Sequence, residues 1–140
     1  MKAIILDQQE RILAWMQKQV DSPRFLPDAK GVALEEDGEL IAGVAFENWT
    51  GSNIFMHVAV NAGVVLTRAR IKVAFAYPFL QLKCRRITGL VRADNMKSQQ
   101  FAEHLGFKQE GRLRHAANDG TDMLVFGLLR EECKWLGATP

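Results

Sequence analysis

The stretch DNMKSQQFAEHLGFKQEGRLR, residues 94–114, specifies a capped helix followed by a strand. Asp94 or Asn95 can accept a backbone N–H at the start of the helix. Small or apolar side chains then recur at the spacing i, i+3, i+4 and i+7, which places one stripe on the helix: Ser98, Phe101, Ala102 and Leu105. Gly106 stands where a left-handed residue ends a helix, and Phe107 opens an extended segment behind it. We therefore expect a helix over about 94–106 and a strand from Phe107.

This stretch resembles the end of the cofactor-binding half of the GCN5-related N-acetyltransferases (GNAT), most closely the ribosomal-protein-type branch. Three motifs carry the resemblance in order: Asn95-x-x-Ser98, Leu105-Gly106-Phe107 and Glu110-Gly111-x-x-Arg114. The resemblance covers roughly residues 30–132. It implies an α+β domain with a mixed central sheet flanked by helices, the acyl-CoA N-acyltransferase fold. It also implies an enzyme that moves acetyl from acetyl-CoA to a primary amine, by direct attack and without an acyl-enzyme.

The rest of the chain alternates strand and helix patterns in the order that this fold requires. Apolar alternation and turn residues predict strands over 2–6, 31–35, 39–46, 54–60, 86–92, 107–116 and 122–129. A first helix should start at Asp7, whose pairing with Glu10 resembles a capping box. A second should span about 65–82, with Pro78 kinking it or marking its last turn. The tail over 130–136 is either helical or frayed.

The length and composition of the chain limit the kinds of protein that it can be. A chain of 140 residues suits one compact domain, 1–140, and its net charge of +2 gives no reason to expect a nucleic-acid or membrane partner. A basic nucleic-acid module is also opposed by the lack of interleaved aromatic and basic residues. Cys84 and Cys133 lie far apart and match no metal spacing, so we expect no metal site and free thiols in a reducing cytoplasm. The apolar run at 3–6 is too short for a signal peptide.

Asn95 and Ser98 are the leading candidates on the donor side. From the residues alone, they need be no more than a helix cap and a small first-turn residue. The resemblance implies that Asn95 hydrogen-bonds the pantetheine arm of acetyl-CoA and that Ser98 lies by the thioester, where its hydroxyl can stabilise the departing thiolate. Phe101, on the same face, joins the cofactor-binding set. Other branches place a tyrosine acid where this chain has Ala102, so Ser98 is the remaining candidate.

The segment 60–72 should hold the phosphates of the cofactor. The resemblance places here a glycine-containing loop whose following helix N-terminus binds pyrophosphate. The cofactor contacts expected from this side are the backbone amides of Val58 and Val60 together with Gly63, Thr67 and Arg68. Val65 departs from the pattern, because a β-branched residue replaces a second small one and would resist positive φ. Arg70 and Lys72 add positive charge near a helix start, which a bound phosphate would offset; solvated basic residues are the alternative.

A base must take a proton from the acceptor amine, and two residues are candidates. His57 shares a strand face with Phe55 and Ala59 and has an unperturbed pKa near neutrality, although a lone strand histidine is often structural. Glu47 ends the preceding strand; it could face a cleft or be a solvated strand end. The glutamate expected from the ribosomal-protein branch is replaced by Ala117. His57 or Glu47, directly or through water, is therefore expected to act as the base.

Two further points stay open at this stage. The missing base position and the Val65 substitution favour an alternative, a catalytically weak or inactive protein of the same fold that acts by protein contact. Trp135 and its apolar neighbours could pack on a second copy and form a homodimer, or pack within the chain. Tyr77 is expected to pack rather than react, and Cys84 to be a buried apolar residue rather than a nucleophile.

Overall fold

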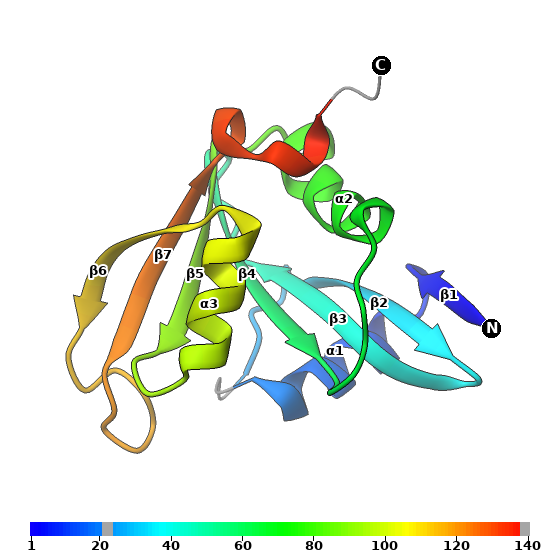
Figure 1. Cartoon of the computed structure of the whole chain (residues 1–140), viewed down its shortest axis with the longest axis horizontal. Coiled ribbons are helices and arrows are strands. Elements are labelled where there is room, and N and C mark those ends of the chain that lie inside the picture. Colours follow the sequence, from blue (N-terminus) through cyan, green and yellow to red (C-terminus); the bar gives the residue numbers. More distant parts are fainter. Residues whose placement is uncertain (21–23, 138–140) are drawn as a thin grey trace.

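A computed structural model describes residues 1–20 and 24–137. Its strands form one seven-stranded sheet in the order β1-β2-β3-β4-β5-β7-β6 (Figure 1). The strands are β1 Lys2–Ile5, β2 Lys30–Glu36, β3 Glu39–Glu47, β4 Asn53–Val60, β5 Arg86–Arg92, β6 Lys108–Leu113 and β7 Met123–Leu129. The helices are α1 Gln9–Gln19, α2 Arg68–Ala76 and α3 Met96–Leu105, with a π-helical turn η1 Tyr77–Gln81 and 3-10 turns η2 Arg130–Glu132 and η3 Lys134–Leu136. The mixed sheet flanked by helices confirms the predicted fold class.

The β4–β5 pair is parallel, whereas the other neighbouring strands are antiparallel. Its register contains only three residue pairs, from Asn53↔Arg86 to Phe55↔Thr88. Both strands continue beyond the last pair, and they diverge toward their carboxyl ends (Figure 1). The sheet is therefore open between the C-terminal halves of β4 and β5.

Helix α3 forms as its local signals predict. The Asn95 side chain accepts the Ser98 N–H at 3.1 Å, which caps the helix start. Gly106 has φ +107° and ends the helix, with its N–H directed to the carbonyls of Ala102 and Glu103. The following strand is shorter than the predicted 107–116, because His115 adopts φ +60° and donates its N–H to Asp122.

Helix α2 is shorter than the predicted 65–82. It starts after Thr67, whose hydroxyl accepts the Arg70 N–H, so residues 65–67 lie outside it. At its other end, Pro78 has no N–H for the α-helical ladder, and the chain changes to a π-helical turn closed by a bond from Leu82 N–H to Tyr77 O. The predicted stripe is confirmed by three buried residues: Ile71, Phe75 and Phe79.

The predicted cap of the first helix is wrong. Helix α1 begins after Gln8, and no side chain caps it. Instead, Gln9 anchors this end to the sheet: its side-chain amide donates to the carbonyls of Leu6 and Gly31 and accepts the Gly31 N–H. A glutamine in the first turn therefore replaces the contact expected from Asp7.

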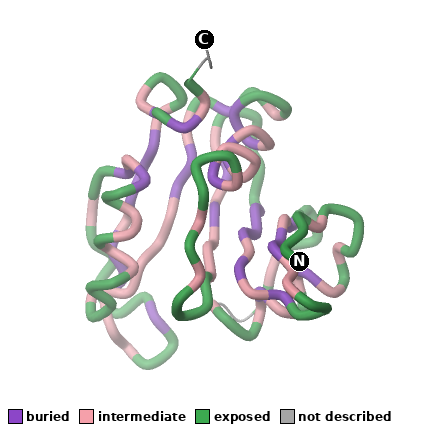
Figure 2. Tube along the Cα trace, turned by 45° about the vertical axis from the view of Figure 1, so that its right-hand side comes forward, coloured by how far each residue is buried: buried purple, intermediate pink, exposed green. Residues whose placement is uncertain are grey.

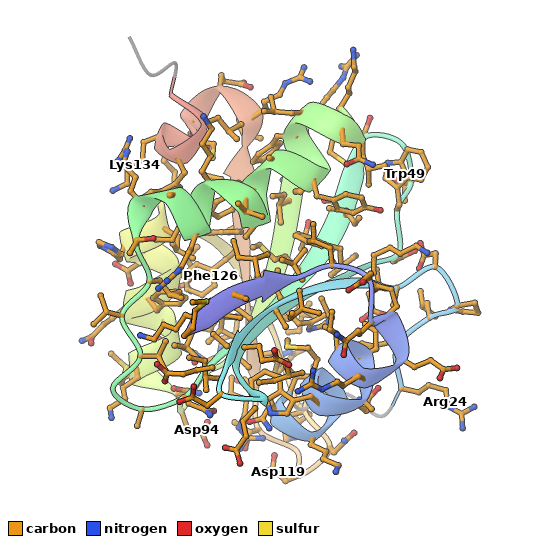
Figure 3. The ribbon with its side chains drawn as sticks, turned by 90° about the vertical axis from the view of Figure 1, so that its right-hand side faces the viewer. Arg24, Trp49, Asp94, Asp119, Phe126 and Lys134 are labelled. Carbon is orange, nitrogen blue, oxygen red and sulfur yellow. The ribbon has the colours of Figure 1, made fainter. Side chains whose placement is uncertain are left out.

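Two apolar cores lie on opposite faces of the sheet. Helices α2 and α3 pack over one core, which includes Phe46 and Met56. Helix α1 covers the other, in which Ile12 and Met16 are fully buried. Figure 2 shows buried residues concentrated along the strands, and Figure 3 shows α1 and α3 on different sides of them.

Among the described residues, no helix combines the length and apolar composition needed to cross a bilayer.

Candidate active site

A cleft of about 540 Å³ runs through the sheet at the opening between β4 and β5. Its walls include residues from both faces of the sheet. Glu47 and His57 line it on the α1 side, whereas Asn95, Ser98 and Phe101 line it from α3 on the other side. A molecule held on the α3 side can therefore meet a second molecule held on the α1 side.

Glu47 and His57, two separate candidates in the sequence, form one hydrogen-bonded pair. His57 Nε2 lies 2.6 Å from Glu47 Oε2, and the side chains are 16% and 11% exposed. The other carboxylate oxygen of Glu47 accepts the Leu26 N–H at 2.8 Å, while the Phe25 ring packs on the imidazole with centroids 5.4 Å apart. A carboxylate only accepts, so in the tautomer with the proton on Nε2 the ring donates to Glu47 and Nδ1 is the nitrogen that can take another proton.

Register explains why these two residues meet. Ala45 is opposite His57 and Glu47 is opposite Phe55, so Glu47 and His57 are diagonal neighbours on one face of the β3–β4 ladder. Residue spacing alone did not predict this contact, because it depends on the register that the 48–52 loop sets. The supporting contacts from Phe25 and Leu26 come from a loop without a sequence signal for this site.

The α3 side of the cleft presents polar groups beside an apolar wall. Asn95 caps the helix with its side-chain oxygen, which leaves its amide N–H groups as the donors of that side chain. Ser98, one turn further on, and Phe101 and Ala102, along the same stripe, line the cleft. The structure thus brings together the α3 residues that the sequence predicted for the donor side.

The edge of β4 that faces β5 carries backbone donors. Asn61 N–H bonds to Ile41 O, toward β3. Since successive amides of a strand point to opposite edges, the N–H groups of Val58 and Val60 point the other way, toward β5. The β4–β5 register has already ended at Phe55 there. These two amides therefore face the opening in the sheet.

The loop between β4 and α2 tolerates the Val65 substitution. Gly63 takes the left-handed conformation, with φ +82°, and no atom lies within 4 Å of where a Cβ would be. Val65 is 71% exposed and is not among the described residues with positive φ. The expected clash with a β-branched residue is therefore not built into this loop, and Thr67 starts the helix that follows.

Arg68 has partners that its sequence position did not reveal. Its guanidinium donates to Lys134 O at 2.8 Å and lies 5.3 Å from the centre of the Trp135 ring. Arg68 thus joins α2 to the C-terminal segment, 66 residues away in sequence. Arg70, half-buried two residues later, is the nearest other basic residue of the same helix.

A cluster of charged residues lies beside the cleft at the start of α3. Arg92, which lines the cleft, pairs with Asp94 at 3.0 Å and with Asp119 at 2.8 Å. The two aspartates lie near one another at one end of the molecule (Figure 3). Arg92 hydrogen bonds lower the pKa of both carboxyls, and at Asp119 bonds from Thr121 add to this effect. The cluster ties the β5–α3 connection, where Asn95 lies, to the turn at 118–121.

No protein-family model matches the sequence, and no curated protein matches it. Solved structures do match. The spermidine/spermine N-acetyltransferase SpeG from Vibrio cholerae, with manganese, has a TM-score of 0.73 at 16% identity, over 93% of each chain. A chimera of SpeG from Vibrio cholerae and hSSAT has a TM-score of 0.74 at 18% identity, over 97% of this chain and 99% of the other. The fold is that of the GNAT-type acetyltransferases.

A probable acetyltransferase gives a TM-score of 0.65 at 22% identity over 76% of this chain, which spans 63% of that longer chain. The likeness to the SpeG structures extends beyond the 30–132 region expected from the motifs. The ribosomal-protein branch stays a prediction, because none of these three neighbours is named for it.

Proposed function

We propose that this protein is an N-acetyltransferase that moves an acetyl group from acetyl-CoA to a primary amine by direct attack. One observation carries the proposal: a single cleft crosses the sheet and joins the His57–Glu47 pair on one face to Asn95 and Ser98 on the other. Group transfer between two bound molecules needs this arrangement, because the reacting atoms must meet with little freedom. The alternative is a catalytically weak protein of the same fold that acts by contact.

The donor would lie on the α3 side of the cleft. The Val58 and Val60 amides would bind the pantetheine arm and polarise the acetyl carbonyl, while Asn95 would donate to the arm and Phe101 would pack on it. The pyrophosphate would bind at the Gly63 loop and the α2 N-terminus after Thr67, where backbone N–H groups and the helix dipole favour anions. Arg68 would contribute long-range positive charge, since its guanidinium is already bonded to Lys134 O.

The reaction would need one base and one group that stabilises the thiolate. The amine nitrogen attacks the thioester carbon, so a C–N bond forms while the C–S bond breaks and its electron pair leaves on sulfur. His57 Nδ1 takes the proton that the amine loses, and Glu47 stabilises the imidazolium through its 2.6 Å bond to Nε2. The Ser98 hydroxyl donates a hydrogen bond to the developing thiolate.

The charges in the cleft favour an acceptor with a single amine, such as a peptide N-terminus or a small amine. Among the described lining residues, Glu47 is the only carboxylate, and it is already bonded to His57 and to the Leu26 amide. The SpeG neighbours are named for spermidine, which carries several positive charges. A polyamine would leave most of those charges without a partner in this cleft.

Thermal unfolding with and without acetyl-CoA tests the donor first, because a ligand that binds the folded state raises the melting temperature. We expect a rise with acetyl-CoA and a smaller one with ATP, which has phosphates but no pantetheine. No rise at millimolar acetyl-CoA would exclude the enzyme.

Release of CoA thiol, measured across amines and short peptides, then tests transfer. The protein should contribute little thiol signal, since Cys84 and Cys133 are buried and burial raises the pKa of both. Binding without any thiol release would favour the inactive alternative.

A further inference from the structure

A small apolar pocket lies beneath α2, next to the cleft. Its volume is about 70 Å³, and its walls come from β1 to β4, α2 and α3. Arg70 is the only charged residue among the described residues that line it. Four residues line both the pocket and the cleft: Met56, Val58, Phe101 and Leu105. The pocket therefore adjoins the cleft on its donor side, at the part of β4 where the Val58 amide faces the opening.

The chemistry of the walls restricts what can fill this space. The pocket opens to solvent on one side, but a water or polar ligand inside it would find almost no polar partners, because all of its lining side chains except Arg70 are apolar. A polar ligand would lose its hydrogen bonds to water without replacement. The volume is about half of the roughly 150 Å³ of an engineered apolar cavity that admits benzene. A short alkyl chain fits both the size and the polarity.

We propose that this pocket receives the acyl chain of a donor longer than acetyl, such as a propionyl or butyryl thioester of CoA. The inference rests on the proposed function, because it places the thioester carbonyl at the Val58 amide. From there, the carbonyl carbon faces the opening toward His57 while the chain extends beneath α2, away from the acceptor. The bonds made and broken are those of acetyl transfer; only the length of the transferred chain differs.

Titration calorimetry of the wild-type protein with acetyl-, propionyl-, butyryl- and octanoyl-CoA tests this without knowing the acceptor. Each methylene buried in an apolar site should tighten binding about fourfold. We therefore expect butyryl-CoA to bind roughly tenfold or more tightly than acetyl-CoA, and octanoyl-CoA to gain nothing further because the pocket is full. Equal or weaker binding of butyryl-CoA, with measurable binding of acetyl-CoA, would overturn the inference and leave the proposed function standing. No binding of any thioester would overturn both.

A variant that fills the pocket provides a second test of the inference. Ala74 lines the pocket from α2 and does not line the cleft, so Ala74→Leu should occupy the space that the longer chain needs. Ala76→Leu, a half-buried position at the other end of the same helix and outside both cavities, is the matched control. We expect Ala74→Leu to remove the advantage of butyryl-CoA and to leave acetyl-CoA affinity within about twofold of wild type. An equal loss for both thioesters would mean that the pocket holds the pantetheine arm, and would overturn the inference.

Discussion

At the scale of single residues, the His57–Glu47 pair combines two tasks. Glu47 is bonded to the imidazole on one side and to the Leu26 amide on the other. The carboxylate thus orients a proton acceptor and holds the 25–26 loop over it, where the Phe25 ring contacts His57. Removing the base and removing the group that orients it should therefore have different kinetic signatures.

His57→Gln should lower kcat for acetyl transfer by about 10²-fold or more, the usual contribution of a general base, without changing acetyl-CoA affinity. Glu47→Gln should lower kcat less, because the base remains in place while the imidazolium loses its carboxylate partner. His104→Gln, on α3 and outside the cleft lining, is the control and should keep wild-type activity. Rates are measured by CoA thiol release between pH 6 and 9. Full activity of His57→Gln would transfer the role of the base to another group or to water.

Asn95 has two roles that substitution can separate. Its oxygen caps α3, and its amide N–H groups are the donors proposed for pantetheine. Asn95→Asp retains a good cap and loses the donors, so we expect unchanged stability and at least fivefold weaker acetyl-CoA binding. Asn95→Ala should weaken binding and also cost about 1 kcal/mol of stability. Urea unfolding and calorimetry measure the two effects. If Asn95→Asp binds acetyl-CoA normally, Asn95 is a helix cap only.

At the scale of elements, the ends of helices and strands are where the structure differs most from the sequence prediction. The sequence was sufficient to predict features that depend on residues close by in the chain. These are the β4 strand, the Asn95 cap of α3 and the end of α3 at Gly106. The end of α2 at Ala76 depends on the Pro78 turn, and the start of α1 depends on the Gln9 contacts with the sheet rather than on a cap from Asp7. The spacing of apolar residues along the sequence predicts neither of these. The meeting of Glu47 and His57 needed strand register, and the Arg68–Trp135 contact needed the packed fold.

The turn at 118–121 is joined to the start of α3 by the ion pairs of Arg92 with Asp94 and Asp119. The contribution of Asp119 to the free energy of unfolding should therefore depend on pH. Arg92 lowers the pKa of Asp119 below the value of about 3.9 in an unfolded chain. A carboxyl with a lowered folded-state pKa stabilises the protein above the unfolded pKa, and this contribution is lost as pH falls through the folded one. Asp119→Asn should therefore destabilise the protein at pH 7, and the difference from wild type should shrink below about pH 4.

Urea unfolding at pH 7, 5 and 3 measures this difference. The amide introduced by Asp119→Asn would still offer an oxygen to the Thr121 N–H, so the substitution removes the charge and the Oδ2 acceptor of Arg92 but keeps the bond within the turn. Asp7→Asn, an exposed change before α1, is the control and should show no such trend. A difference that grows toward acid would contradict the role assigned to the Arg92 pairs.

At the scale of the whole molecule, the C-terminal segment joins α2 and α3 on one face of the sheet. Trp135 is 7% exposed and donates its indole N–H to Leu105 O, the end of α3, at 2.8 Å. The same ring lies against Arg68 of α2 and His104 of α3. A homodimer remains a prediction, and the indole of Trp135 already packs within one chain.

Trp135→Ala should therefore destabilise the folded monomer by about 3–5 kcal/mol, the usual cost of deleting a large buried aromatic side chain. Trp135→Phe keeps most of the apolar area but leaves Leu105 O without its donor, so we expect a loss of only about 1 kcal/mol. Trp49→Ala, which removes a half-exposed tryptophan, should cost less than Trp135→Ala. Urea unfolding gives the free energies, and light scattering gives the oligomeric state. The opposite result would be an unchanged unfolding free energy together with conversion of a dimer to a monomer. It would mean that the indole packs between copies, because a contact within one chain could not be lost without destabilising the fold.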